Sequence, residues 1–279
     1  MTQEPTLQRV QRRLLVGAVV LLAVLVTGYL IFVLTPWGQR HDAAAYVARF
    51  TMDRRVRRMA GVLTDLVGIL SIALLAIALL VYAWRRGRVI AGLVVGVAWA
   101  GAVGLAELLK WILPRPPLVP PQKWMVHLEQ SYPSGHVTVT TSAALAIVLL
   151  VPARWRPWVG IGAGVASAAY GGAVVVTSMH RPADALGAIA LSAALMSIAA
   201  VALIGLWGRR IENAPSARLP IVLCAIAALV SAALWWAFAT RRFPNMDSRE
   251  LVVFTSAISV AAFSVTAWFG AQTRAFDWN

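Results

Sequence analysis

Long, uninterrupted apolar runs are the feature that most constrains the fold of this chain. Roughly residues 14–35, 89–112 and 182–207 each hold about twenty or more mainly apolar residues, the length that crosses the hydrocarbon core of a bilayer as a helix. The runs do not alternate between apolar and polar positions, which excludes a membrane barrel. Because only helices and closed barrels satisfy their backbone in lipid, we predict an all-α, polytopic membrane helix bundle.

The composition agrees with an integral membrane protein. Of the 279 residues, 60% are hydrophobic and 13% are charged, which leaves too little polar surface for a soluble domain. The net charge of +14 comes from cations in short loops, so we expect membrane lipids and a phosphorylated substrate as partners, and no nucleic acid. Cys224 is the only cysteine, so no intramolecular disulfide is possible.

We expect about eight transmembrane helices, at roughly residues 14–35, 61–83, 89–112, 135–152, 158–178, 182–207, 219–239 and 250–271. Residues 42–60 are too polar to span, and either an amphipathic surface helix or a solvated loop explains them. Five prolines between positions 114 and 121 predict an extended, stiff loop.

The order of these spans places three polar elements on one side of the membrane. Lys110 ends the third span, His136 begins the fourth and His180 follows the fifth. Lysines and arginines divide almost evenly between the two sides, so the positive-inside rule does not fix the orientation. Setting aside the cations of a phosphate site favours cytoplasmic termini and an outward-facing site, which we expect in a bacterial plasma membrane.

Ser134, Gly135 and His136 open the fourth span. Glycine lets the backbone approach an anion closely, and the first turn of a helix presents unpaired N–H groups at the positive end of its dipole. A phosphate would suit this corner, and His136 could donate a proton to a leaving oxygen. An ordinary helix start explains the same three residues.

His180 and Asp184 form a second element. Asp184 comes four residues after His180, within reach of an imidazole N–H once the helix that Pro182 opens has begun. A carboxylate there fixes the tautomer and makes the other ring nitrogen more nucleophilic. The alternative is that Asp184 only stabilises a helix N-terminus. Lys110 offers a cation, although such a lysine commonly reaches lipid head groups or pairs with a neighbour such as Glu107.

Together these elements resemble the type 2 phosphatidic acid phosphatase superfamily, the membrane enzymes related to vanadium haloperoxidases. The resemblance covers roughly residues 61–207. It rests on Lys110, on Pro-Ser-Gly-His at positions 133–136, on His180 with Asp184, and on the order and spacing of these motifs.

The resemblance implies a role for each motif residue. His180 would attack phosphorus to form a phosphohistidine, and Asp184 would orient it. His136 would protonate the leaving group and then activate water. The implied phosphate ligands are Lys110, Ser134 and Gly135. The resemblance implies neither a metal nor another cofactor.

The sequence departs from the family pattern at three positions. Pro117 stands where the first motif has its arginine, and Arg115 comes two residues earlier. Ala173 and Val174 replace the Ser-Arg that opens the third motif. Two cations are thus missing from their usual places, and each charge-assisted contact is worth about 1.5–3 kcal/mol. We predict that Arg115 and Arg181 take their place as phosphate ligands.

We therefore expect a membrane enzyme that removes phosphate or pyrophosphate from a lipid of the polyprenyl, phosphatidate or phosphatidylglycerol phosphate type. One alternative is a phosphotransferase that uses the same residues, and another is a family member that binds lipid phosphate without cleaving it. A small transporter fits less well, because the ionisable residues lie at the ends of the spans and not at the bilayer midplane.

For the domain organisation, we predict a six-helix phosphatase-like domain over residues 1–218, with its motif-bearing core at 61–207. Residues 219–279 would add two transmembrane helices. These could mediate a homo-oligomer, shape a lipid groove or simply face lipid.

Overall fold

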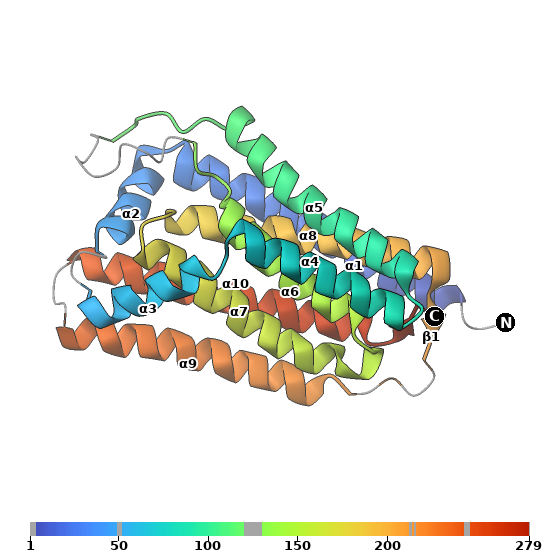
Figure 1. The fold of residues 1–279 in the computed structure, drawn as a ribbon. Helices are drawn as coiled ribbons and strands as arrows, with labels where there is room; N and C mark the ends of the chain where they lie inside the picture. The colour runs from blue at the N-terminus through green and yellow to red at the C-terminus, as the bar shows by residue number, and fades with distance from the viewer. Residues whose placement is uncertain are drawn as a thin grey trace.

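The computed structural model describes residues 4–48, 52–119, 130–211, 214, 216–242 and 246–278. Long helices lie side by side in one elongated bundle (Figure 1). The α-helices of these residues are α1 (Glu4–Gly28), α2 (Pro36–Val47), α3 (Arg54–Asp65), α4 (Ile69–Arg85), α5 (Val89–Ile112), α6 (Gly135–Leu150), α7 (Arg156–Val176), α8 (Pro182–Trp207), α9 (Arg218–Arg242) and α10 (Met246–Thr273). The π-helix η1 (Tyr29–Val33) continues α1, the 3₁₀ turn η3 (Ala153–Trp155) precedes α7, and the two-residue strands β1 (Arg209–Arg210) and β2 (Phe276–Asp277) pair antiparallel.

The all-α, polytopic bundle predicted from the apolar runs is confirmed. Five segments are long and apolar enough to cross a membrane: Leu7–Val33, Val89–Ile112, Ala153–Val176, Pro182–Trp207 and Arg249–Thr273. The bent pair α3 and α4 counts as a sixth span if taken together. The other two of the eight expected spans correspond to α6, which is short at Gly135–Leu150, and to α9, of which the apolar part Arg218–Leu234 is described.

Helix α6 is short because Ser134 caps its start and Pro152 follows its end. Its 16 residues rise about 24 Å, less than the roughly 30 Å of a hydrocarbon core. Most of its side chains are buried, so α6 is enclosed by other helices and is not matched to lipid on its own.

The span predicted over 61–83 is broken, because the chain bends by 54° between α3 and α4. A new helix begins at Gly68, whose N–H donates to Ser71 Oγ at 2.9 Å. For residues 42–60, the helical interpretation holds over the described part, since α2 and α3 cover most of it. On α3 the arginines are exposed while Ala60 is buried, as in an amphipathic helix.

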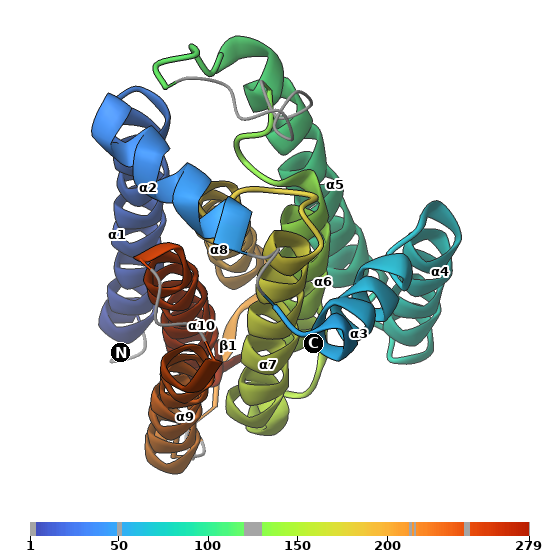
Figure 2. The ribbon, with the colours of Figure 1, turned by 90° about the vertical axis from the view of Figure 1, so that its left-hand side faces the viewer.

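Helix α2 runs across one end of the bundle, as Figure 2 shows. Thr35 caps it by accepting the Gly38 N–H at 2.9 Å. A Cβ on Gly38 would lie 2.0 Å from the carbonyl oxygen of Ile31, so this tight turn requires glycine. Gln39 then donates to the carbonyl oxygens of Val33 and Pro116, at 2.7 and 2.6 Å, and thereby ties the loop after α5 to α2.

Helix α8 lies at the centre, packed against α1, α5, α6 and α10, and nearly all of its side chains are buried. Helix α10 packs closely along α7. The buried Arg156 of α7 donates to the Thr273 carbonyl oxygen at 2.7 Å, and its guanidinium lies 3.9 Å from the Trp278 ring centroid. The boundary at residue 218 stays a prediction, but α10 shares one core with α7 and α8.

Candidate active site

The candidate site lies at the end of the bundle that α2 crosses, and both termini lie at the opposite end (Figure 1). Two helices begin here, α6 at Gly135 and α8 at Pro182. The Ser134 N–H donates to the Asp184 carbonyl oxygen at 2.9 Å, which joins the two helix starts directly. The motifs that the spans were predicted to bring to one side are therefore in contact.

Ser134 performs a structural task at this corner. Its hydroxyl oxygen accepts the Val137 N–H at 3.3 Å, and its carbonyl oxygen accepts the Thr138 hydroxyl at 2.8 Å. The side chain is fully buried as the N-cap of α6. The ordinary helix start considered from the sequence thus describes the Ser134 hydroxyl, while the α6 N-terminus still presents its dipole to the site.

Tyr132 anchors the segment that leads to Ser134. It is buried against α8, where a Cβ on Gly187 would lie 2.6 Å from the tyrosine hydroxyl oxygen. The hydroxyl donates to the Leu25 carbonyl oxygen of α1 at 2.6 Å. Burial in this apolar place raises the pKa of Tyr132, so the phenol stays protonated and continues to donate.

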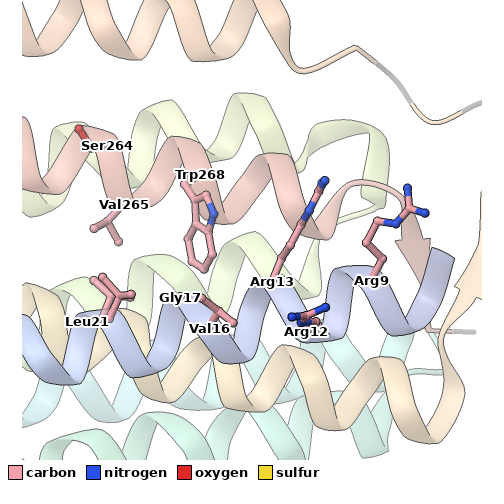
Figure 3. A pocket seen from close by; sticks show the side chains of 10 residues that line it. Arg9, Arg12, Arg13, Val16, Gly17, Leu21, Ser264, Val265 and Trp268 are labelled. Carbon is pink, nitrogen blue, oxygen red and sulfur yellow. The ribbon is translucent and has the colours of Figure 1, made fainter. Parts of the chain in front are cut away.

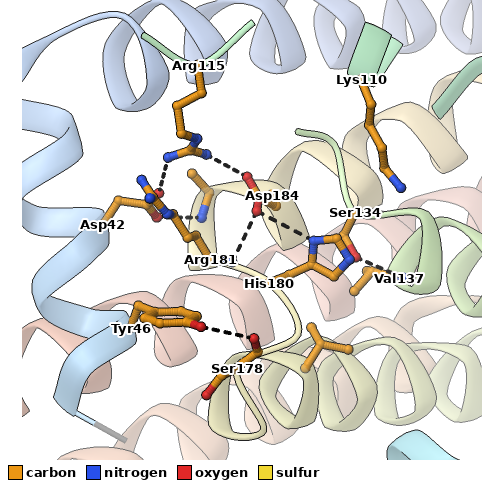
Figure 4. Close-up of polar contacts among 12 residues, drawn as sticks. Asp42, Tyr46, Lys110, Arg115, Ser134, Val137, Ser178, His180, Arg181 and Asp184 are labelled. Carbon is orange, nitrogen blue, oxygen red and sulfur yellow. Dashed lines mark hydrogen bonds and ion pairs between the residues drawn. The ribbon is translucent and has the colours of Figure 1, made fainter. Parts of the chain in front are cut away.

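Asp184 stabilises the start of α8 and also faces His180 (Figure 4). Its Oδ2 accepts the Arg181 N–H at 3.1 Å, which satisfies a free donor at the start of α8. The same oxygen lies 3.5 Å from His180 Nδ1, an ion-pair distance that is longer than a good hydrogen bond. Asp184 is fully buried and His180 is 6% exposed. The carboxylate thus faces one ring nitrogen of His180.

The two predicted catalytic histidines lie together. The ring centroids of His136 and His180 are 5.8 Å apart, and the rings are inclined by 60°. His136 is half-buried at the first turn of α6. At this separation the two rings are direct neighbours, so a group bound beside them could reach both.

Lys110 reaches the same corner from α5. A Cβ on Gly135 would lie 3.0 Å from Lys110 Nζ, so the ammonium sits at the N-terminus of α6. Glu107 pairs with Lys110 at 2.7 Å, and its Oε1 would lie 2.3 Å from that same Cβ. A carboxylate therefore occupies the place where the sequence predicts a phosphate. The side chain of Glu107 is 54% exposed, so it can turn away into solvent.

Both terminal amino groups of Arg115, one of the two arginines predicted as replacement phosphate ligands, pair with carboxylates. Its Nη1 donates to Asp42 Oδ2 at 3.0 Å and its Nη2 to Asp184 Oδ1 at 2.7 Å. Burial lowers the pKa of Arg115, but the two carboxylates outweigh this effect and raise it, so the guanidinium is permanently charged. The guanidinium of Arg115 thus holds the carboxylate of Asp184 in position.

Asp42 is the residue that sequence reasoning missed. Besides Arg115, it accepts the Ala183 N–H at 2.9 Å through Oδ1, so α2 is bound to the first turn of α8. Burial raises the pKa of Asp42, and Arg115 opposes this. In sequence, Asp42 was one carboxylate in a polar segment interpreted as surface. The only signal was that no other acidic residue lies within 36–48.

The end of α7 and the turn that follows it hold the start of the third motif. Val174 is fully buried in the core, so an arginine there would place its charge among apolar side chains. The Val174 carbonyl oxygen accepts the N–H groups of Met179 and His180, at 2.9 and 3.2 Å. Ser178 has φ +67°, and its carbonyl oxygen accepts the Tyr46 hydroxyl at 3.2 Å. This turn delivers His180 to the site.

Arg181 follows His180 and lies within the same cluster (Figure 4). Its side chain is buried, and burial together with the neighbouring Arg115 lowers its pKa. The carboxylates of Asp42 and Asp184 act in the opposite direction. For both Arg115 and Arg181, the role of phosphate ligand stays a prediction.

Comparison with known proteins adds one finding. Residues 91–207 match the model of the PAP2 superfamily, and this match includes Lys110, Ser134, Gly135, His136, His180 and Asp184. No curated protein and no solved structure matches the chain. Asp42 and α2 lie outside the matched residues.

Proposed function

We propose that the chain is a membrane phosphatase acting on a phosphorylated or pyrophosphorylated lipid, because its residues 91–207 match the PAP2 superfamily. The superfamily consists generally of phosphatases, so the reaction class at the coarse level is phosphoric ester hydrolysis. The observation that carries the finer proposal is the placement of His180: its Nδ1 lies 3.5 Å from Asp184 Oδ2, and its ring centroid lies 5.8 Å from that of His136.

In the proposed first step, the ring nitrogen of His180 that faces away from Asp184 attacks phosphorus. A nitrogen–phosphorus bond forms while the bond from phosphorus to the leaving oxygen breaks. His136 gives its proton to that oxygen. The leaving group is the lipid alcohol, or the lipid phosphate when a pyrophosphate is cleaved.

In the second step, His136 takes a proton from water and the water oxygen attacks phosphorus. The nitrogen–phosphorus bond breaks, inorganic phosphate leaves and His180 is restored. Asp184 orients the imidazole throughout and stabilises its positive charge. The Arg181 N–H and the Arg115 guanidinium hold the two Asp184 oxygens, so the carboxylate is fixed before substrate arrives.

The phosphate would bind at the start of α6. Lys110 Nζ and the free N–H groups of the first turn lie there, and both favour an anion. Glu107 would turn into solvent as phosphate enters. Arg181 offers a further cation on the α8 side.

The position at the end of the bundle suits a lipid substrate. Polar head groups lie at this level of a bilayer, so a lipid could present its phosphate while its chains stay in the hydrocarbon core. An outward-facing site in a bacterial plasma membrane remains part of the proposal.

The test uses the full chain purified in detergent, with chelator present, and a panel of radiolabelled phosphatidate, phosphatidylglycerol phosphate and polyprenyl diphosphate. We expect phosphate release and an acid-labile, alkali-stable phosphoryl label on the protein. Both should be lost in His180→Ala. His41→Ala is the matched control, because His41 lies at the same end but its side chain pairs with Glu250 at 2.7 Å.

Two outcomes would change the proposal. Label that moves to an added alcohol and not to water would make the chain a phosphotransferase. A folded protein that binds one of these lipids, forms no label and releases no phosphate would overturn catalysis and leave a lipid-phosphate-binding protein.

A further inference from the structure

A second site lies at the end of the bundle that holds the termini. A groove of about 570 Å³ runs between α1 and α10 (Figure 3). Its α1 wall carries Arg9, Arg12 and Arg13 at the outer end and Val16 and Val20 further in, and Trp268 lies on its α10 wall. Neither the motifs nor the proposed reaction uses any of these residues.

The three arginines form a concentrated positive charge on one face of α1. Positions 9, 12 and 13 are spaced three and four residues apart, so their side chains are neighbours on the helix surface. All three are exposed, and none has a hydrogen-bond or ion-pair partner among the residues that the structure describes. Like charges at this spacing destabilise a helix unless an anion lies between them.

The inner part of the groove is apolar. Val16 and Val20 are each 55% exposed, although the span Leu7–Val33 has a membrane-crossing length. A Cβ on Gly17 would lie 2.3 Å from the Trp268 ring, so the indole packs directly against the α1 backbone and closes one side of the groove. The groove is therefore cationic at its outer end and apolar further in, and it runs along the direction of a membrane span.

We propose that this groove binds one anionic phospholipid from the leaflet at the termini end. The phosphate of its head group lies among Arg9, Arg12 and Arg13, and an acyl chain lies along Val16, Val20 and Trp268. The charge of the outer end selects an anion, and the apolar wall selects an anion that carries a hydrocarbon chain. A free phosphate would leave the apolar wall without a ligand. An apolar partner helix would leave the three arginines without an anion.

The first test titrates the full chain in detergent with phosphatidylglycerol or phosphatidylcholine, and native mass spectrometry counts the retained lipids. Each arginine near a membrane surface is worth about 1 kcal/mol, so the triple variant R9Q/R12Q/R13Q should bind phosphatidylglycerol about a hundredfold more weakly. The matched control is R85Q/R86Q/R154Q, three exposed arginines at the same end but outside the groove. This control should lose less than about twofold, because its charges do not line the site.

The second test fills the groove and leaves the charge unchanged. Val16→Trp places an indole in the groove, whereas Val19→Trp adds the same ring to α1 at a position that is 66% exposed and does not line it. We expect weaker phosphatidylglycerol binding in Val16→Trp alone, with the same circular dichroism in both variants.

Four results would overturn the site. They are equal binding of the two lipids, equal loss in the two triple variants, an unaffected Val16→Trp, and inorganic phosphate that displaces the lipid at millimolar concentration. Because the groove and the histidines lie at opposite ends, phosphate release assayed on the same samples tests the proposed reaction separately.

Discussion

Arg115 Nη2 and Asp184 Oδ1 lie 2.7 Å apart, and this contact joins the loop after α5 to the first turn of α8. The second amino group of Arg115 holds Asp42 of α2 at 3.0 Å. One buried guanidinium therefore pairs with two buried carboxylates and connects three segments of the chain. The carboxylate that faces His180 owes its position to a residue that does not itself contact the histidine.

Arg115→Met should disrupt this arrangement. It leaves two carboxylates buried without their shared cation, and breaking a buried pair costs about 3–5 kcal/mol. We expect a lower unfolding temperature in detergent and a lower kcat for phosphate release. Arg115→Lys keeps the charge but not the two-pronged geometry, so it should fold better and still turn over slowly. A variant with unchanged kcat and a raised KM would instead make Arg115 a phosphate ligand.

Asp42→Asn should show how much Asp42, which holds Arg115 but does not face His180, contributes to turnover. The amide keeps an acceptor for the Ala183 N–H but removes one charge from Arg115. Because Asp42 does not contact His180, we expect a smaller loss of kcat than in Asp184→Asn, where the catalytic carboxylate itself is neutralised. Steady-state phosphate release by both variants measures the difference. Equal losses would show that the charge of the whole cluster matters, and not its geometry.

Glu107→Gln should strengthen anion binding. The Glu107 carboxylate pairs with Lys110 and lies against Gly135, so it competes with a phosphate at the α6 N-terminus. Removing a like charge near a helix start is worth about 0.3–1 kcal/mol, which predicts about two- to fivefold tighter inhibition by inorganic phosphate. Glu250→Gln, at the same end but paired with His41, serves as the control. Weaker inhibition in Glu107→Gln would contradict the competition.

Arg156→Met should weaken the attachment of α10 to α7. It removes the donor to the Thr273 carbonyl oxygen and the cation over the Trp278 ring. A buried carbonyl left without a donor costs about 1–3 kcal/mol, so the unfolding temperature should fall. Turnover per folded molecule should stay the same, because Arg156 lies far from the histidines. Replacement of the exposed Arg154 by Met provides the comparison. An equal fall in unfolding temperature in Arg154→Met would argue against a specific role of Arg156 in attaching α10 to α7.

The class of fold and the elements of the site could be predicted from the sequence. Apolar runs of about twenty residues specify membrane helices whatever their neighbours are, since lipid offers the backbone no other partner. The order of the spans then places Lys110, His136 and His180 on one side. Helix lengths within the bundle were less predictable, because α6 is enclosed by other helices and the bend before α4 depends on local capping at Gly68.

The partners of the charged residues were decided only by the tertiary structure. Arg115 and Asp184 are 69 positions apart, and Arg115 and Asp42 are 73 apart. No periodicity or motif relates such distant positions, so a sequence that shows a spare arginine cannot show whether it meets a phosphate or a carboxylate. Spacing along the chain determined which groups share a face, and only packing determined which of them touch.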